Sequence, residues 1–522
     1  MKKVAKRLCL TLIASLILSF RLGEVHNNLP TSIVTDGLLT ATLSSPHSHG
    51  PLNVIVFYPD DWRHDDLGDT NAILKTPFFS RLAKEGIRFT HNAVTTSICW
   101  ISRATLFSGQ WVSRHASTYL SRPAFASDPV RWSKTWPYLL QKAGYWVGHV
   151  GKWQYHDTNG YKNKIFNFSS FFEGYMWGTS SDGNKIHIAD KAGTEAIRFL
   201  RERPKDRPFA LTVAFYPPKG IFDGKDCPWN ATRLYENFSI PEPYDRTKAY
   251  QNLPPFLQNN QTEARSRYLY RFEKHGTFES SMRAQYSMIS HIDGVCEKVT
   301  EELKRQKAYN NTVIIITADN GEFHGWHALA DKWYPYQESI RVPLIIKDPR
   351  MPMKKRGTVD NSFTLNVDLA STILGAAGLD SSKEMQGRDI GDLYLSLPKS
   401  IEPWRSEYYY EFPDINSWIP PSTALVRRKW KYINWPKHNY EQLFDLEEDP
   451  LEFQNLLSNN NCSDIVQEMR QRLIELRHDV FEPLVPGTWC DPLWPRGTNL
   501  ENKPDCSPET SHRCCNSSSG SR

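Results

Sequence analysis

The chain has 522 residues, and a composition of 39% hydrophobic and 12% aromatic residues is typical of a globular protein, which excludes a wholly disordered chain. Lys and Arg number 63 against 58 Asp and Glu, but five of the basic residues and none of the acidic ones lie in residues 1–22. The rest of the chain is formally neutral. It therefore lacks the excess of positive charge that a protein needs to bind along a polyanion, which argues against nucleic acid as a partner.

The first 22 residues predict a signal peptide. Four basic residues precede an apolar run over residues 8–20, which is shorter than the roughly 20 residues of a membrane-spanning helix. A signal anchor is the alternative. No later segment is apolar for long enough to span a membrane. Seven Asn-x-Ser/Thr sequons favour the secretory pathway, with an extracellular or lysosomal destination. They lie at Asn167, Asn230, Asn237, Asn260, Asn310, Asn461 and Asn516.

From residue 53 onward, strand-like and helix-like segments alternate, which is typical of an α/β fold with a large, mostly parallel sheet flanked by helices. The predicted strands cover residues 53–58, 145–150, 209–215, 312–317 and 342–347. Thr76, Pro77 and Gly86 suit the N-cap, the first position and the C-terminal end of a helix after the first strand. A longer amphipathic helix is predicted over residues 281–304.

Near residue 400 the pattern changes to short aromatic strands, at 407–412 and 423–435, and then to a charged helix at 465–477. We therefore expect a main domain over residues 51–400 and a smaller α+β subdomain with an antiparallel sheet over residues 401–485. Residues 486–522 are rich in Pro, Ser and Cys and predict a tail outside the core. Disulfides are expected in this tail, with a pairing that the sequence leaves open.

Oxygen-bearing side chains follow two of the predicted strands. Asp60 and Asp61 come after the first strand, and Asp319 and Asn320 follow the strand at 312–317. The carboxyl ends of parallel strands are where open α/β sheets place their ligands. Carboxylate and amide oxygens suit calcium or magnesium. An Asp-Asp pair by itself is usually a polar turn, so the metal site is predicted from the two strand ends together.

Between these strand ends, residues 99–103 read Cys-Trp-Ile-Ser-Arg, and residues 104–109 run on to Ser108-Gly109. This segment resembles the signature of the sulfatase family, in which Cys-x-Pro/Ala-x-Arg leads into a short helix that ends in Ser/Thr-Gly. A lone cysteine in a secreted chain is more often half of a disulfide or a buried thiol. The interpretation therefore depends on the motifs that accompany Cys99.

Further motifs occur in the order of the sulfatase family, from residue 53 to about residue 457. Gly151-Lys152-Trp153 is similar to an element whose lysine holds the substrate sulfate, and Asp319-Asn320-Gly321-Glu322 resembles the second metal motif. Lys332, ahead of the segment 338–343, matches the second sulfate-binding lysine. Residues 367–370 and 445–456 look like later elements of the family. Several of these matches are weak singly, but their order and number make the resemblance strong.

The resemblance implies an alkaline phosphatase superfamily fold and a sulfuric ester hydrolase. Cys99 would be oxidised by the formylglycine-generating enzyme to formylglycine, whose hydrate attacks sulfur with one hydroxyl and expels sulfate with the other. One calcium ion would be the cofactor. Its implied ligands are Asp60, Asp61, Asp319, Asn320 and the modified Cys99. Arg103, Lys152 and Lys332 are the implied catalytic cations, and the two lysines also bind the substrate sulfate. With the metal, these groups form a pocket of net positive charge.

Three positions depart from the family pattern. Ile101 replaces the Pro or Ala of the cysteine motif, Gln154 stands where histidine usually follows Lys-Trp, and Lys219 stands where Pro-His is common. We expect Gln154 and Lys219 to bind substrate. Because glutamine cannot shuttle protons at neutral pH, His156 or His327 is the expected catalytic acid, unless both are ordinary surface or core residues.

These features predict hydrolysis of sulfate monoesters, either of a sulfated glycan or of an aryl or small alcohol. Two alternatives stay open. A phosphatase or phosphodiesterase of the wider superfamily would usually have two metals and a Ser or Thr nucleophile. A non-catalytic protein that binds sulfated glycans would have kept the fold while Ile101 prevented conversion of Cys99. The identity of the sulfated substrate depends on loops around the pocket and is not encoded in these motifs.

Overall fold

The computed structural model describes residues 50–117, 128–155, 164–180, 182–220, 226–242, 246–274, 276–396, 402–458 and 462–481. The predicted signal peptide, His156 and the cysteine-rich tail lie outside these residues. Within them, none of the helices is both long enough and apolar enough to cross a membrane. The domain boundaries at residues 51, 400 and 485 stay predictions.

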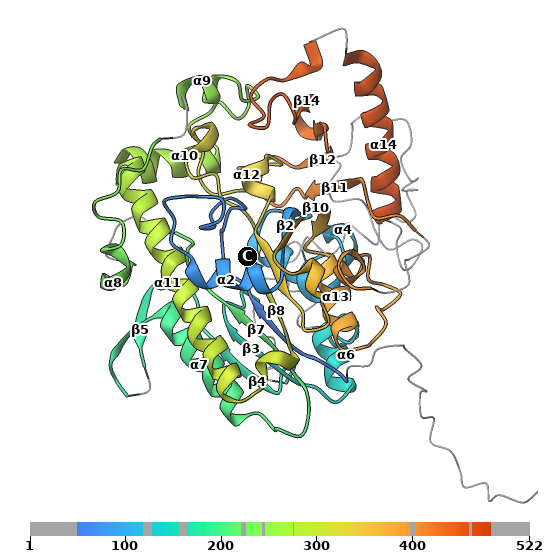
Figure 1. Cartoon of the computed structure of the whole chain (residues 1–522). Helices are drawn as coiled ribbons and strands as arrows, with labels where there is room; N and C mark the ends of the chain where they lie inside the picture. The colour runs from blue at the N-terminus through green and yellow to red at the C-terminus, as the bar shows by residue number, and fades with distance from the viewer. Residues whose placement is uncertain are drawn as a thin grey trace, which may run out of the picture. The chain divides into compact units, whose positions relative to one another are not determined.

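An eight-stranded sheet lies at the centre of the main domain (Figure 1), with strand order β10-β2-β9-β8-β1-β7-β3-β4. Only β9 runs antiparallel to its neighbours, β2 and β8. The predicted mostly parallel sheet is therefore confirmed. The strands are β1 (Asn53–Phe57), β2 (Ile87–Ala93), β3 (Trp146–Gly151), β4 (Phe168–Phe171), β7 (Phe209–Ala214), β8 (Thr312–Thr317), β9 (Leu344–Lys347) and β10 (Thr358–Leu365).

Helices cover both faces of this sheet, because the central strands are apolar on both sides. In β1, Ile55 and Phe57 belong to one core cluster, whereas Val54 and Val56 belong to the other, as the two-residue period of a strand requires. The first cluster includes side chains of α2 (Pro77–Glu85), α7 (Ile188–Glu202) and α11 (Phe278–Arg305). The second includes those of α3 (Cys99–Ser108), α6 (Trp136–Lys142) and α13 (Asp368–Ala376).

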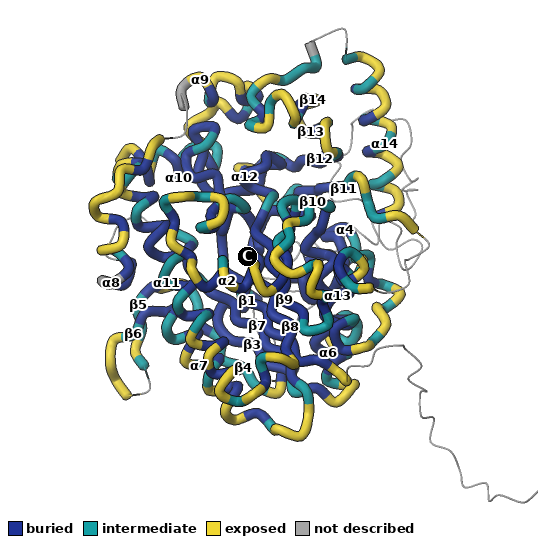
Figure 2. The backbone as a smooth tube through the Cα atoms, viewed as in Figure 1, coloured by how far each residue is buried: buried dark blue, intermediate teal, exposed yellow. Residues whose placement is uncertain are grey.

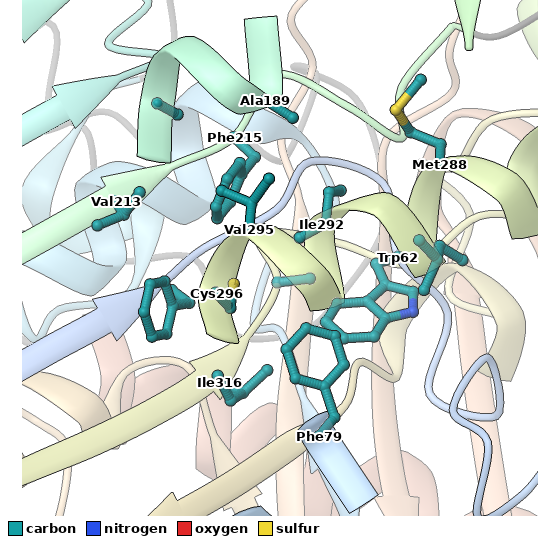
Figure 3. Packing of buried hydrophobic residues seen from close by; sticks show 14 of the residues in the cluster. Trp62, Phe79, Ala189, Val213, Phe215, Met288, Ile292, Val295, Cys296 and Ile316 are labelled. Atoms are coloured by element: carbon teal, nitrogen blue, oxygen red, sulfur yellow. The ribbon is translucent and has the colours of Figure 1, made fainter. Parts of the chain in front are cut away.

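Figure 3 shows how α11 fills the first cluster. Ile292, Val295 and Cys296 of this helix lie among Ala189 of α7, Val213 of β7 and Ile316 of β8. Figure 2 shows the same central strands as a buried layer beneath partly exposed helices. Burial raises the pKa of the Cys296 thiol well above its ordinary value, so this cysteine behaves as a small apolar core residue.

The C-terminal subdomain is a four-stranded antiparallel sheet, as predicted, with order β11-β12-β13-β14 and one long helix, α14, whose apolar residues join its core. The predicted strand at 423–435 is in fact a hairpin of two strands. The elements are β11 (Glu407–Phe412), β12 (Ser422–Arg427), β13 (Trp430–Trp435), β14 (Tyr440–Asp445) and α14 (Ser463–Phe481). The remaining short elements are β5 (Trp177–Thr179), β6 (Lys185–His187), α4 (Val112–His115), α5 (Pro129–Trp132), α8 (Trp229–Thr232), α9 (Arg246–Gln251), α10 (Glu263–Tyr268), the π-helix η3 (Leu269–Lys274) and α12 (Gln337–Ile340).

The N-terminus of α2 is capped from another helix. Thr76 has the N-cap position that the sequence predicts, but its hydroxyl makes no cap hydrogen bond and accepts one from the Gly68 amide instead, at 2.8 Å. The carboxylate of Asp293, on α11, accepts hydrogen bonds from the amides of Phe78 at 3.0 Å and Phe79 at 2.7 Å. A buried carboxylate thus satisfies two amide groups that a helix leaves unpaired.

We expect Asp293→Ala to lower the free energy of unfolding by about 1–3 kcal/mol, because it leaves two buried amides without acceptors. Urea denaturation measures this change. Glu301→Ala is the matched control, since Glu301 is an exposed acid on the same helix with only a surface partner, Lys304. Equal losses in the two variants would show that the cross-helix cap contributes nothing measurable.

Candidate active site

Four neighbouring strands, in the order β8, β1, β7 and β3, are parallel and end at one edge of the sheet. Polar side chains follow each of them. These are Asp319 and Asn320 after β8, Asp60 and Asp61 after β1, Lys219 in the loop after β7, and Lys152 directly after β3. Segments far apart in the sequence thus meet at the carboxyl edge, where α/β sheets place their ligands.

The loops at this edge are bonded to one another. The Trp62 amide donates to the Asn320 carbonyl at 2.9 Å, and the Asp61 amide donates to Asp319 Oδ1 at 3.2 Å. Asp61 has a φ of 61°, in the left-handed region that side chains other than glycine rarely adopt. These bonds hold the carboxylates of two strands against each other.

Cys99 is the first residue of α3 and is 2% exposed. Its Sγ lies 3.1 Å from the ammonium nitrogen of Lys219 and 3.2 Å from that of Lys332. The positive end of the helix dipole lies at the same point. Cationic groups therefore converge on the sulfur from two loops and one helix.

The C-terminal subdomain holds the loops on both sides of this cysteine. The Tyr410 hydroxyl, from β11, accepts a hydrogen bond from the Ser97 amide at 3.3 Å and donates one to the Trp333 carbonyl at 2.7 Å. The Glu411 amide donates to the Thr95 carbonyl at 3.0 Å. A single strand of the small sheet thereby positions both the Cys99 loop and the Lys332 loop.

Buried ion pairs connect the acidic and basic residues of the site. Arg103 donates to Asp319 Oδ2 from Nε at 2.9 Å and pairs with the same oxygen through Nη2 at 2.7 Å. The ammonium groups of Lys152 and Lys332 pair with Asp60 and Asp61, respectively. With Lys219, four cations face three carboxylates, so the site carries a positive charge before any metal binds.

The three carboxylates differ in how well their charges are compensated. Burial and the neighbouring Asp319 raise the pKa of Asp60 to about 6, against the opposing effect of Lys152. Burial acts in the same direction on Asp61, but Lys219 and Lys332 hold the pKa of that carboxyl well below its usual range. Burial also opposes ionisation of Asp319, whose pKa Arg103 and Lys152 nevertheless keep below the ordinary value. Asp60 is thus the carboxylate with the least compensation.

The donor set fits a calcium ion. Asp60 Oδ1 and Asn320 Oδ1 are buried and accept no hydrogen bond from any residue that the structure describes. Asp61 Oδ2 has only an ion-pair contact, with the Lys219 ammonium 3.4 Å away. One ligand atom each from Asp60, Cys99 and Asp319 also lies within 4.8 Å of the others. Unpaired oxygens without histidine among them favour a hard cation.

Two residues expected at the site have their polar partners elsewhere. His327 is buried against Tyr336, with ring centroids 4.7 Å apart, and its Nε2 lies 3.5 Å from Glu338. The Gln154 amide donates to Glu173 at 2.8 Å. Between described residues, neither side chain forms a hydrogen bond or ion pair with Cys99 or with the carboxylates Asp60, Asp61 and Asp319. His156 lies outside the described residues.

A small polar recess beside Asp61 contains residues that the sequence motifs do not indicate. These are Arg271, Ser281, Gln285 and His324, which line the recess together with Glu322 of the second metal motif and other residues. The His324 ring bonds to Asp66, with Nε2 and Oδ2 3.0 Å apart. The only signal in the sequence is that His324 follows the Asp319-Asn320-Gly321 motif closely.

Comparison with known proteins identifies relatives of this arrangement. The sulfatase family model matches residues 52–379, and a model of the C-terminal region of N-sulphoglucosamine sulphohydrolase matches residues 321–479. An N-acetylglucosamine-6-O-sulfatase of Bacteroides thetaiotaomicron is 24% identical, over 81% of this chain and 86% of the relative. An extracellular sulfatase SULF-1 homolog of Drosophila melanogaster is 27% identical, over 69% of this chain and 33% of the relative. A protein solved with its substrate D-glucosamine-2-N,6-O-disulfate superposes with a TM-score of 0.68 at 22% identity, covering 83% of this chain and 98% of that one.

We expect Ca²⁺ to raise the melting temperature of protein first treated with a chelator, because a ligand that binds only the folded state stabilises it, by about 2.7 kcal/mol at 100 times its Kd. Asp61→Asn should reduce this shift. Asp69→Asn, which alters an exposed aspartate eight residues away, should retain it. An identical calcium response in both variants would remove Asp61 from the metal site.

Proposed function

The chain belongs to the sulfatase family of sulfuric ester hydrolases, and we propose that it hydrolyses sulfate monoesters of a glycan, with a formylglycine made from Cys99 and one calcium ion. The observation that carries this proposal is the position of Cys99. Its sulfur lies at the N-terminus of α3, in contact with the Lys219 and Lys332 ammonium groups and grouped with Asp60 and Asp319. A cysteine of a structural disulfide does not require ammonium groups and carboxylates around its sulfur.

The four cations suit a sulfate group that is bound beside residue 99. Lys219 and Lys332 already contact the sulfur atom, and Lys152 lies behind them, paired with Asp60. Hydrogen-bond donors fixed in a buried site stabilise charge that develops on the sulfate oxygens as the ester bond breaks. Arg103 stays on Asp319 and holds that carboxylate in place.

Formylglycine at residue 99 would supply a hydrated aldehyde with two hydroxyl groups, one to attack sulfur and one to allow the release of sulfate. Cys99 and Ile101, the departure from the family motif, are both buried on α3. The formylglycine-generating enzyme would therefore have to reach this segment before the chain folds, and the partnership with that enzyme is part of the proposal.

Calcium would be held by Asp60, Asp61, Asp319, Asn320 and the oxygen-bearing form of residue 99, and would lower the pKa of a hydroxyl bound to it. The chain's contribution is to fix the ligands. Asn320 Nδ2 donates to Asp61 Oδ1 at 2.6 Å. This bond fixes the orientation of the amide group and leaves Asn320 Oδ1 without a hydrogen-bond partner among the described residues.

A sulfated glycan is the favoured substrate class, because one relative is an N-acetylglucosamine-6-O-sulfatase and another was solved with its substrate D-glucosamine-2-N,6-O-disulfate. We place the protein in the secretory pathway, with an extracellular or lysosomal destination. The predicted signal peptide, the sequons and the similarity to the extracellular sulfatase of Drosophila melanogaster support this proposal. The runner-up, phosphate ester hydrolysis, is tested by assaying sulfate and phosphate monoesters side by side with the same alcohol.

Cys99→Ser tests the chemistry separately from the fold. Serine supplies one hydroxyl in place of two, so the attack on sulfur persists in weakened form while the release of sulfate cannot follow. We expect this variant to release at most one equivalent of phenol from an aryl sulfate and to retain a sulfate ester on the new serine. Intact mass spectrometry detects that adduct.

The mass of the peptide that contains Cys99, after secretion from a cell able to make formylglycine, is the accompanying measurement. An unmodified thiol in an active enzyme, or repeated turnover by Cys99→Ser at the wild-type rate, would favour phosphatase-like serine chemistry. An unmodified thiol in an inactive protein that still binds sulfated glycans would favour the non-catalytic alternative.

Lys152→Ala and Lys332→Ala should each lower kcat for a sulfate ester by about 10²–10³-fold, since a donor aimed at developing charge is lost. Lys307→Ala, at an exposed lysine, is the control. Because both site lysines are paired in the core, melting curves must show that the variants fold at the assay temperature. Near wild-type kcat in folded variants would show that these lysines do not touch the sulfate.

A further inference from the structure

The departing alcohol of a sulfate ester requires a proton, and no histidine occupies the two positions where the family commonly has one. Gln154 has no titrating group. Lys219 is paired with Asp60 at 3.7 Å and Asp61 at 3.4 Å, and its ammonium faces the sulfur of Cys99. A histidine that donates a proton to the leaving oxygen must therefore come from elsewhere in the chain.

His327 does not fit this role in the structure. Its ring is enclosed by Phe323, Tyr336 and Phe453, and Nε2 is directed to Glu338. These contacts explain the burial of His327 as part of an aromatic core. A group that must reach the substrate would need one free nitrogen toward the site.

One nitrogen of the His324 ring is left free by the described residues. Its Nε2 bonds to Asp66 Oδ2 at 3.0 Å, and no hydrogen bond between described residues reaches Nδ1. The ring lines the same recess as Asp61, one of the proposed calcium ligands. A carboxylate on one ring nitrogen fixes the orientation of an imidazole. Asp66 thus holds the ring with its second nitrogen available to a ligand.

The recess is built to receive a polar group. Ser281 and Gln285, on α11, are only 5% and 7% exposed, and their Oγ and Nε2 atoms have no hydrogen-bond partner among the described residues. Both line the recess with His324. Buried polar atoms are normally paired, so unpaired ones that face a common space indicate a missing partner such as a hydroxyl group or a water.

We propose that His324 is the general acid that protonates the leaving oxygen, with Asp66 as its positioning residue; this assignment rests on the proposed sulfatase activity. As the ester S–O bond breaks, its electron pair stays on the alcohol oxygen. That oxygen takes the proton from Nδ1 of the imidazolium ring. The alcohol departs, and the neutral ring regains a proton from the water that hydrolysis consumes.

Charged groups surround His324 from several segments of the chain. Asp66 bonds to it directly, and Glu322, Arg271 and Asp61 line the recess from other segments. Arg271 is paired with Glu322 at 3.0 Å and with Asp331 at 2.8 Å. The arginine charge is thus compensated, and Asp66 is the group that acts most directly on the ring.

The test compares two esters that differ only in the basicity of the leaving group, phenyl sulfate and 4-nitrophenyl sulfate. A general acid matters most for the more basic phenolate. His324→Gln should therefore lower the ratio of kcat/KM for phenyl sulfate to that for 4-nitrophenyl sulfate by at least tenfold. Asp66→Asn should lower the same ratio by a smaller factor.

The proposal is overturned if folded His324→Gln has the wild-type ratio of kcat/KM values for the two esters. It is also overturned if His327→Gln lowers this ratio and His324→Gln does not. Wild-type enzyme provides a measurement that needs no variant. Its kcat/KM for phenyl sulfate should fall with rising pH more steeply than that for 4-nitrophenyl sulfate, because only the protonated ring donates. Identical alkaline limbs overturn the assignment of His324. Absence of any turnover by wild-type enzyme that carries formylglycine overturns the proposed function as well, which distinguishes the two failures.

Discussion

Three carboxylates and three cationic side chains are buried together beyond the carboxyl ends of β8, β1, β7 and β3, beside the half-buried Lys219. A buried charge without a partner costs several kcal/mol, so each of these groups depends on another that a different loop supplies. Asp319 needs Arg103 from α3, and Asp60 needs Lys152 from the end of β3. The requirement that charges be paired thus couples the geometry of the site to the order of strands in the sheet.

The same dependence extends to the C-terminal subdomain. Tyr410 bonds to the loop before Cys99 and to the loop after Lys332, and Arg405 donates to Asp368 at the start of α13 at 2.7 Å. These bonds join the C-terminal subdomain to the main domain through buried or half-buried groups. The small sheet is therefore part of the framework of the site, even though it supplies none of the proposed metal ligands.

Lys219 changes the electrostatics of the site compared with a histidine at that position. Burial would lower the pKa of its ammonium group, but Asp60 and Asp61 raise it well above the ordinary value. A histidine would change charge between about pH 5 and 8, whereas this lysine stays positive. A permanent cation with a raised pKa holds an anion well but is a weak acid at neutral pH. This division of roles leaves proton transfer to another residue.

The sequence by itself determined the central strands, because runs of Val and Ile that are buried on both faces carry a strong local signal, as in β1 and β8. It also placed Asp60, Asp61, Lys152 and Asp319 at one edge of the sheet, since each of them closely follows a predicted strand. It did not indicate β10 (Thr358–Leu365), where polar and apolar residues mix at the edge of the sheet. Only the tertiary structure decided that Tyr410 supports the cysteine loop, that His327 belongs to an aromatic core, and that His324 bonds to Asp66. These contacts join residues that are far apart or lie in irregular loops, where neither periodicity nor spacing constrains the direction of a side chain.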